Sequence, residues 1–221
     1  MNNFILPRLE ILQTRLFHYT LLSKISNGVL LSISAYLLGS ISFGFLIGKL
    51  KGVDIRKIGS KSTTSTNVAR ALGWRWGIIS AILDFSKGVV PTLLAKIYLF
   101  NHPWQIIIIA LLPTVGHVLP VWLKFRGGKG ASTFYAATLT LIGLKYFLLF
   151  FLFWILILAI TKTMSMANIL FPWVLVILIS LFFPLYYVVF AFLGASFLLF
   201  AFRENIKRIK EGIEPKISFR W

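Results

Sequence analysis

Residues 124–130 carry the strongest chemical signal in the chain, because they read Lys-Phe-Arg-Gly-Gly-Lys-Gly between two apolar stretches. Glycine lets a backbone approach a ligand closely, and the N–H groups at the start of a following helix bind anions. A positive-inside signal would account for the cations but would not require the glycines. We therefore interpret this segment as a phosphate site at a membrane surface, formed by Gly127, Gly128, Lys129 and Gly130.

A second polar cluster spans residues 59–67 and is rich in serine and threonine. It is followed by Arg70, whose guanidinium group is suited to binding phosphate through two parallel hydrogen bonds. We expect Ser60, Thr66 and Asn67 to orient a polyol or to stabilise developing charge. A connector with a helix cap is the structural alternative, because these residue types favour turns and N-caps.

A third cluster lies in the C-terminal basic tail, at residues 203–216. We expect Asn205, together with Arg203 and Lys207, to close the site from this tail. The alternative is a solvated tail that binds anionic lipid head groups through its charge.

Three ionisable residues stand inside apolar stretches. Asp84 and Lys87 are three residues apart, so they share one helix face, and we interpret them as a structural ion pair near the active surface. His117 is a candidate base, a packing residue or an orienting residue. The sequence shows neither a Ser-His-Asp nor a Cys-His arrangement for covalent catalysis, and it indicates no metal site and no cofactor.

The composition is typical of a membrane protein, since 58% of the 221 residues are hydrophobic. Apolar stretches recur along the chain at lengths close to the ~20 residues that span a bilayer. The formal charge of +17 indicates anionic partners such as membrane lipids or phosphorylated substrates. The basic residues are confined to short loops, which disfavours nucleic acid as a partner.

We predict an all-α, polytopic membrane protein with seven short transmembrane helices. Pairing of some short spans into re-entrant segments would reduce the count to five. Residues 1–28 are an N-terminal extension, either an interfacial amphipathic helix or a poorly ordered segment, and residues 29–221 form one integral-membrane domain. The expected spans are 29–48, 76–100, 105–123, 131–144, 146–160, 168–183 and 185–202.

The positive-inside rule then sets the orientation, because seven spans place the polar loop, the glycine-rich segment and the basic tail on one side of the membrane. That side should face the cytoplasm. All three clusters would meet there beside an apolar groove.

Taken in order, the clusters resemble the signatures of the acyl-phosphate:glycerol-3-phosphate acyltransferases of bacterial phospholipid synthesis, the PlsY family. The resemblance covers about residues 30–217 and includes a looser match at residues 39–44. The principal matching stretches are 54–60, 66–73, 84–91, 116–133 and 203–215.

The resemblance implies transfer of a fatty acyl group from acyl phosphate to the 1-hydroxyl of glycerol 3-phosphate, which gives lysophosphatidic acid and phosphate. It implies catalytic roles for Ser60, Arg70 and Lys129. It also implies residence in the bacterial plasma membrane, with the active site facing the cytoplasm. We expect direct transfer in which a substrate phosphate oxygen competes with His117 as the proton acceptor.

The chain departs from the family pattern in several places. Lys61, Ser62 and Thr64 replace Gly, Asn and Gly in the first signature, which makes that loop bulkier and adds a cation. Phe202 stands where the family often has histidine. The N-terminal extension has no counterpart in the family pattern.

Three other functions are alternatives to an acyl-phosphate-dependent acyltransferase. An acyl-CoA-dependent acyltransferase would carry an aspartate five residues after a histidine, and none of the three histidines has one. A transporter of phosphorylated small molecules would show internal repeats and helices interrupted near the midplane. A diverged family member with an altered acceptor is the remaining alternative.

Overall fold

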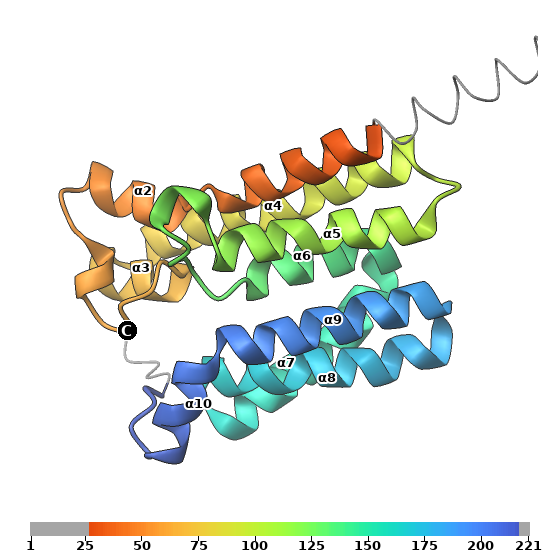
Figure 1. Ribbon diagram of the computed structural model, residues 1–221. Helices are drawn as coiled ribbons and strands as arrows, with labels where there is room; N and C mark the ends of the chain where they lie inside the picture. Colours follow the sequence, from red (N-terminus) through yellow and green to blue (C-terminus); the bar gives the residue numbers. More distant parts are fainter. Residues whose placement is uncertain (1–26, 217–221) are drawn as a thin grey trace, which may run out of the picture.

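The computed structural model describes residues 27–216, which form helices joined by short turns (Figure 1). The proposed role of residues 1–28 therefore falls almost entirely outside the described residues. The first helix covers residues 27–40. It is followed by α2 (Phe43–Leu50), η2 (Ile55–Lys57), α3 (Ser65–Leu72), α4 (Trp74–Tyr98), α5 (Pro103–Val118), η3 (Val121–Leu123), α6 (Ala131–Ile142), α7 (Leu144–Thr161), α8 (Met164–Phe182), α9 (Leu185–Ala201) and α10 (Arg203–Lys210).

An all-helical membrane fold is confirmed for the described residues, whereas the count of seven spans is not. Within residues 27–216, five helices are long and apolar enough to cross a membrane. A sixth candidate joins α9 and α10, which meet at a bend of 60°. The remaining apolar helix, α6, has 12 residues and is about 18 Å long, which is shorter than the ~30 Å hydrocarbon core.

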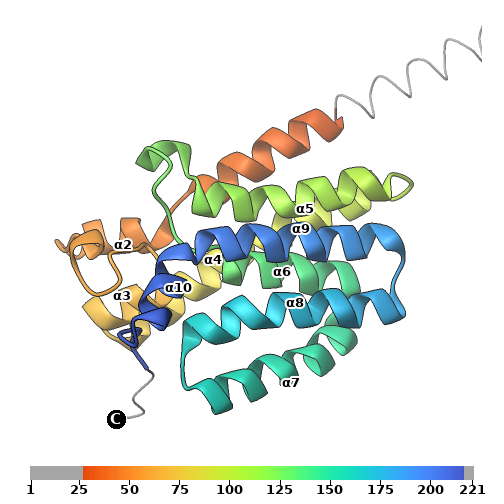
Figure 2. The ribbon, with the colours of Figure 1, turned by 60° about the horizontal axis from the view of Figure 1, so that its bottom comes forward.

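The short helix α6 lies at the centre of the bundle, where it packs against α4, α5, α7 and α9. Figures 1 and 2 show the first helix and α5 on one side of it and the α7–α8 pair on the other. Gly88 on α4 allows a close contact with α6, because a Cβ atom there would collide with the backbone of Thr133. The centre of α6 is accordingly buried, and Phe134 stacks on Phe190 of α9 with 5.3 Å between ring centroids.

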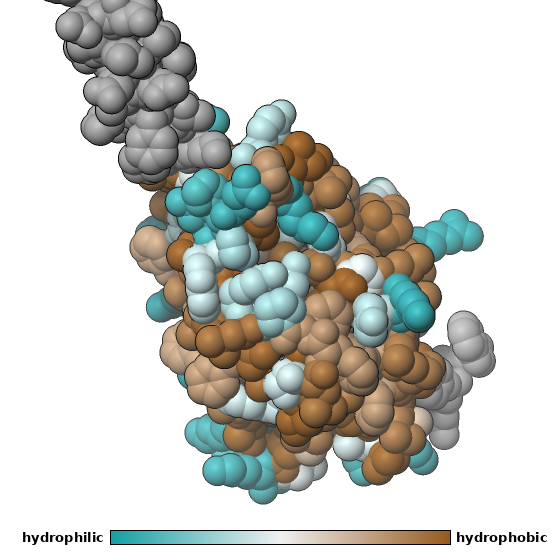
Figure 3. Space-filling view, turned by 90° about the vertical axis from the view of Figure 1, so that its right-hand side faces the viewer, coloured by the Kyte–Doolittle hydropathy of each residue, from teal (hydrophilic) through white to brown (hydrophobic). Residues whose placement is uncertain are grey.

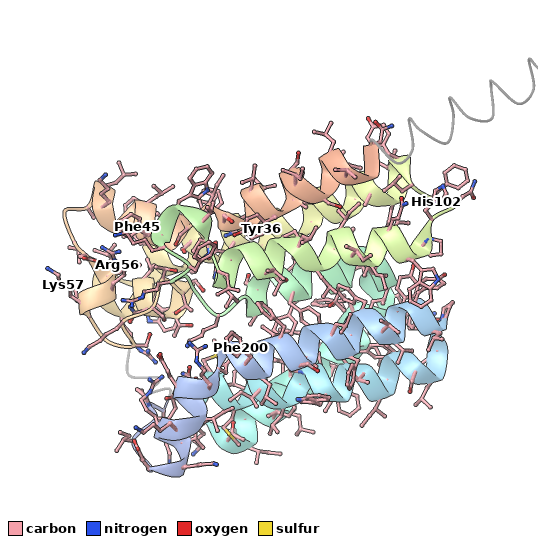
Figure 4. All side chains as sticks on the ribbon, in the orientation of Figure 1. Tyr36, Phe45, Arg56, Lys57, His102 and Phe200 are labelled. Atoms are coloured by element: carbon pink, nitrogen blue, oxygen red, sulfur yellow. The ribbon has the colours of Figure 1, made fainter. Side chains whose placement is uncertain are left out.

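The two ends of the bundle differ in character. The helices α2, α3 and α10 and the glycine-rich loop gather at one end, on the left of Figure 1. Arg56, Lys57 and Phe200 mark that end in Figure 4, and His102 marks the opposite end. Brown apolar residues cover much of the opposite end, with smaller hydrophilic patches (Figure 3). The three polar clusters expected from the sequence therefore come together at one end of the bundle.

Candidate active site

A cavity of about 380 Å³ lies at the polar end of the bundle, and residues of all three clusters line it. Arg70 comes from α3, Lys129 from the glycine-rich loop and Asn205 from α10. A wider opening of about 1070 Å³ shares Ser60 and Lys129 with this cavity. The cations along the wider opening are Arg56, Lys61, Lys124, Arg126 and Arg203. An anion that approaches the cavity therefore passes a cationic vestibule.

The side chain of Asn67 stabilises the loop that carries Ser60. This side chain is fully buried; its Nδ2 atom donates to the carbonyl oxygens of Ile55, Ile58 and Ser62. Its Oδ1 atom accepts from the backbone N–H of Ser60 at 3.0 Å. Because all its polar atoms make bonds within the loop, Asn67 shapes the loop, and its assignment to a ligand stays a prediction.

The residues that depart from the family pattern add hydroxyl groups to this loop. Ser60 Oγ lies 2.9 Å from Ser62 Oγ, and Ser62 Oγ lies 3.2 Å from Thr64 Oγ1. Thr64 also caps α3 by accepting from the backbone N–H of Asn67. All three hydroxyl residues, and Thr66 beside them, line the cavity. The loop thus presents a connected row of hydroxyl groups that begins at Ser60.

The glycine-rich loop folds back onto the end of α5. The backbone N–H groups of Gly127 and Gly128 donate to the carbonyl oxygens of Val118 and His117, at 3.1 and 3.0 Å. A Cβ atom on Gly128 would collide with the imidazole of His117, so only glycine fits there. The Gly128 N–H, which the sequence analysis assigned to a phosphate, is therefore used within the fold in this structure.

The N–H groups that remain for an anion belong to the start of α6, directly after Gly130. A helix start provides several N–H groups and a partial positive charge. Gly130, Ala131 and Ser132 line the cavity. The anion site predicted at the glycine-rich segment is thus moved by a few residues toward the helix.

Lys129 reaches from this loop to the end of α9. Its Nζ atom donates to the carbonyl oxygen of Ala201 at 2.9 Å, where the helix dipole favours a cation. Burial lowers the pKa of Lys129; among the charged neighbours, Glu204 raises this pKa and Arg208 lowers it further. A partly desolvated ammonium group of this kind interacts strongly with an anion that enters the cavity.

The other three cations expected from the sequence differ in where they lie relative to the two cavities. Arg70 lines the cavity and makes no hydrogen bond or ion pair with any residue of the described 27–216 segment. Arg203 borders the wider opening and stacks on Phe200, with its guanidinium carbon 4.5 Å from the ring centroid. Lys207 lines neither cavity, and its Nζ atom lies 3.9 Å from Glu211 Oε1. The structure therefore does not bring Lys207 to the site.

Asn205 belongs to a buried network that attaches α10 to α8. Its Nδ2 atom donates to Ser165 Oγ and to Glu214 Oε1, both at 2.8 Å, and Arg208 Nε donates to Glu214 Oε2 at 2.7 Å. Burial raises the pKa of Glu214, but the hydrogen bonds from Ser165, Asn205 and Arg208 outweigh burial and hold this pKa below its usual value. The Oδ1 atom of Asn205 is buried and has no hydrogen-bond partner among the described residues.

Asp84 and Lys87 form the expected ion pair, with 2.8 Å between Lys87 Nζ and Asp84 Oδ1. Lys87 Nζ also donates to the carbonyl oxygens of Gly39 and Ile41, where the first helix is interrupted. The same ammonium lies 3.0 Å from His117 Nδ1. The same His117 Nδ1 lies 3.5 Å from Asp84 Oδ1. The buried pair therefore fixes the position of the imidazole through this nitrogen.

The inner half of the cavity is apolar and aromatic. Phe147, Phe151 and Trp154 lie on one face of α7 and stack in a row, with centroid distances of 5.5 and 4.8 Å. Phe85 of α4 and Tyr135 of α6 also line the cavity, and Tyr135 packs against Phe151 with 6.5 Å between ring centroids. This half, which we call the aromatic slot, is apolar and therefore suited to a hydrocarbon chain.

Sequence reasoning missed two polar residues of the cavity, Ser165 and Asn168 on α8. Ser165 lies in the short polar stretch before the expected span 168–183, and Asn168 is the first residue of that span. The one available signal was a polar side chain inside a membrane helix, which in such helices usually faces the protein interior.

Comparisons with known proteins agree with these observations. The profile of the family described as glycerol-3-phosphate acyltransferase matches residues 29–212. The glycerol-3-phosphate acyltransferase of Desulforamulus reducens is 41% identical over 192 residues, which cover 86% of this chain and 95% of that protein. The corresponding protein of Pelagibacter ubique is 37% identical over 196 residues, with coverages of 85% and 96%.

A solved structure shares the fold. It is PlsY, an integral membrane glycerol 3-phosphate acyltransferase, in its glycerol 3-phosphate form, with a TM-score of 0.83 and 34% identity over 87% of this chain and 96% of that chain. The lysophosphatidic acid form of PlsY gives a TM-score of 0.81.

Proposed function

Because this chain belongs to the glycerol-3-phosphate acyltransferase family, we propose that its cavity transfers a fatty acyl group from an acyl phosphate to the 1-hydroxyl of glycerol 3-phosphate. The chain is an integral-membrane acyltransferase of phospholipid synthesis. The observation that carries the choice of donor is the cavity itself, in which cations and hydroxyl groups continue into an aromatic slot. A phosphorylated head joined to a hydrocarbon chain matches both halves.

The chemistry requires no covalent intermediate on the enzyme. The 1-hydroxyl oxygen of glycerol 3-phosphate bonds to the acyl carbonyl carbon, and the bond from that carbon to the phosphate oxygen breaks. The hydroxyl proton passes to the departing phosphate, so the products are lysophosphatidic acid and inorganic phosphate. An acyl phosphate is already activated, and the enzyme can therefore act by positioning and charge stabilisation.

The residues of the cavity divide these tasks between them. Arg70, which has no protein partner in the described segment, binds one phosphate, and Lys129 with the N–H groups at the start of α6 binds the other. Ser60 orients the acceptor hydroxyl. Asn205 accepts a hydrogen bond from the glycerol backbone through Oδ1, and Arg203 attracts the anion at the wider opening.

We assign the polar end of the bundle to the cytoplasmic side of a bacterial plasma membrane. The reason is electrostatic, since the cations of the described loops gather at that end and short basic loops remain in the cytoplasm. Glycerol 3-phosphate would enter from the aqueous side, and the acyl chain would reach the aromatic slot from the bilayer. Residues 29–221 act as one acyltransferase domain.

The test is an assay of purified protein with acyl phosphate and glycerol 3-phosphate, in which phosphate release and lysophosphatidic acid are both measured. Lys129→Ala should lower kcat by about 10²–10³-fold, the magnitude typical for loss of one charge-stabilising donor. Lys210→Ala removes an exposed cation from α10 that lines neither cavity and should leave the rate unchanged. Wild-type protein that forms no lysophosphatidic acid would refute the proposed reaction.

A further inference from the structure

Asn168 lies between the polar and aromatic halves of the cavity, where the acyl carbonyl of a bound donor would lie. It is three residues after Ser165 on α8, so the two side chains share a helix face and are separated by about 4.5 Å along the axis. Ser165 contacts Asn205 in the polar half, whereas Asn168 contacts the ring systems of Tyr135 and Trp154 in the aromatic slot.

The hydrogen bonds of Asn168 fix which way its amide group points. Tyr135 Oη lies 3.1 Å and Trp154 Nε1 lies 3.0 Å from Asn168 Oδ1. The indole N–H of tryptophan is a donor only, so the atom that faces it must be the amide oxygen. Two donors from different helices therefore hold the amide in one orientation and leave its NH₂ group on the other side.

The NH₂ group of Asn168 is a donor without an acceptor. It makes no hydrogen bond with any residue between 27 and 216, and its side chain is partly exposed where it lines the cavity. Phe85, Phe147 and Phe151 line the same cavity and offer no oxygen. A neutral donor in such a place suits a neutral acceptor at the head of an apolar chain.

We propose that Asn168 Nδ2 donates a hydrogen bond to the carbonyl oxygen of the acyl donor, an assignment that rests on the proposed function above. As the acceptor hydroxyl attacks the carbonyl carbon, this oxygen gains negative charge, and a fixed donor in a water-poor slot stabilises it. Asn168 is thus a catalytic residue of the acyl half of the site. Tyr135 and Trp154 are positioning residues that hold its amide.

Two substitutions at Asn168 separate the donor from the structural contact. Asn168→Asp keeps an oxygen for Tyr135 and Trp154 but replaces the NH₂ group, and Asn168→Leu is neutral and removes both. Each should lower kcat about 10²–10³-fold, while the KM for glycerol 3-phosphate stays within about twofold, since the lost contact concerns the acyl donor only. In Asn168→Asp, the activity relative to wild type should rise as the pH falls, because a protonated carboxyl group donates again.

Two control variants weaken the hydrogen bonds to Asn168 Oδ1 and retain the NH₂ group of Asn168. Tyr135→Phe and Trp154→Phe each remove one of the two bonds to Oδ1, so kcat should fall no more than about threefold with the other bond in place. Thermal unfolding in detergent is followed for every variant.

A wild-type kcat in Asn168→Leu would overturn the inference. Equal losses of kcat and of thermal stability in Asn168→Asp and Tyr135→Phe would also overturn it, because the role would then be structural. These outcomes presuppose an active wild type; an inactive wild type would instead refute the proposed function.

Discussion

The two halves of the cavity are stabilised by different kinds of interaction. The polar half is fixed by directional bonds: Asn67 holds the serine loop, Gly127 and Gly128 dock on α5, and Glu214 ties α10 to α8. Helix α7 lines the aromatic slot. Only 11% of its residues are buried, compared with 56% in the span that contains α5. Its other contacts are largely non-directional ring packing.

This difference matches the two parts of the substrate. Bond making at a carbonyl requires atoms held within a fraction of an ångström, and a hydrogen-bonded frame supplies that precision. A hydrocarbon chain has no directional groups, and a weakly packed helix beside lipid can adjust to it. We expect substitutions in the polar half to change rate and stability and those in the slot to change which chain is accepted.

The largest effect should follow from breaking the buried pair beneath the polar half. Lys87→Met leaves the carboxylate of Asp84 buried without its cation, and loss of one partner costs about 3–5 kcal/mol. Lys96→Met, which removes one bond to the carbonyl oxygen of Thr140 at the other end of α4, should cost only about 1 kcal/mol. Denaturant unfolding in detergent measures both. Equal losses would show that the polar end has no special rigidity.

The next effect concerns the attachment of α10. Glu214→Gln weakens the bonds to Arg208 and Ser165, so stability should fall by about 1–3 kcal/mol and kcat should fall with it. The folded-state pKa of Glu214 lies below its usual value, so the wild-type contribution is complete above the unfolded-state pKa and is lost as the pH falls through the folded-state pKa.

Unfolding of wild type and Glu214→Gln, compared between neutral and acidic pH, checks this contribution. The difference between the two proteins should shrink as the solution becomes acidic. A difference that grows at acidic pH would mean that Glu214 is not held in its charged form.

In the slot, Phe147→Ala should change selectivity more than rate. Phe147 is a buried wall residue near the start of α7, and its loss makes room for additional methylene groups, each worth about 0.8 kcal/mol when buried. The preferred acyl phosphate should therefore become longer. Leu148→Ala, its exposed neighbour, is the control and should leave the preference unchanged. A kcat loss without a change in preference would place Phe147 among the rate-determining residues.

The sequence was informative where function resides in contiguous segments. The residue types around Ser60, Lys129 and Asn205 could be recognised because loops carry whole binding motifs in a few neighbouring positions. Ser165 and Asn168 could not be recognised, since they lie at the start of a membrane helix whose rotation about its axis depends on packing.

Some details within the recognised motifs could not be predicted. The sequence could not reveal that the N–H of Gly128 is used by His117 or that Asn67 points inward, because both depend on how a loop folds back. The count of seven spans is not confirmed for a related reason, since α6 is apolar but short and packs against four neighbouring helices.

The smallest effect should come from Lys61, which tests whether the charge or the shape of the serine loop matters. Its φ of 54° lies in the left-handed region, which costs a residue with a side chain about 1–2 kcal/mol. Glycine adopts this conformation readily but loses more entropy on folding, so Lys61→Gly should change stability by less than about 1 kcal/mol. Removing a cation from the opening should raise the KM for glycerol 3-phosphate a few-fold and leave kcat unchanged.

Lys61→Asn also removes the charge but tolerates the left-handed conformation, and it should match Lys61→Gly in KM. A fall in kcat for the glycine variant alone would mean that a stiff residue between Ser60 and Ser62 keeps the hydroxyl row aligned, so that rigidity in the polar half extends to its outermost loop.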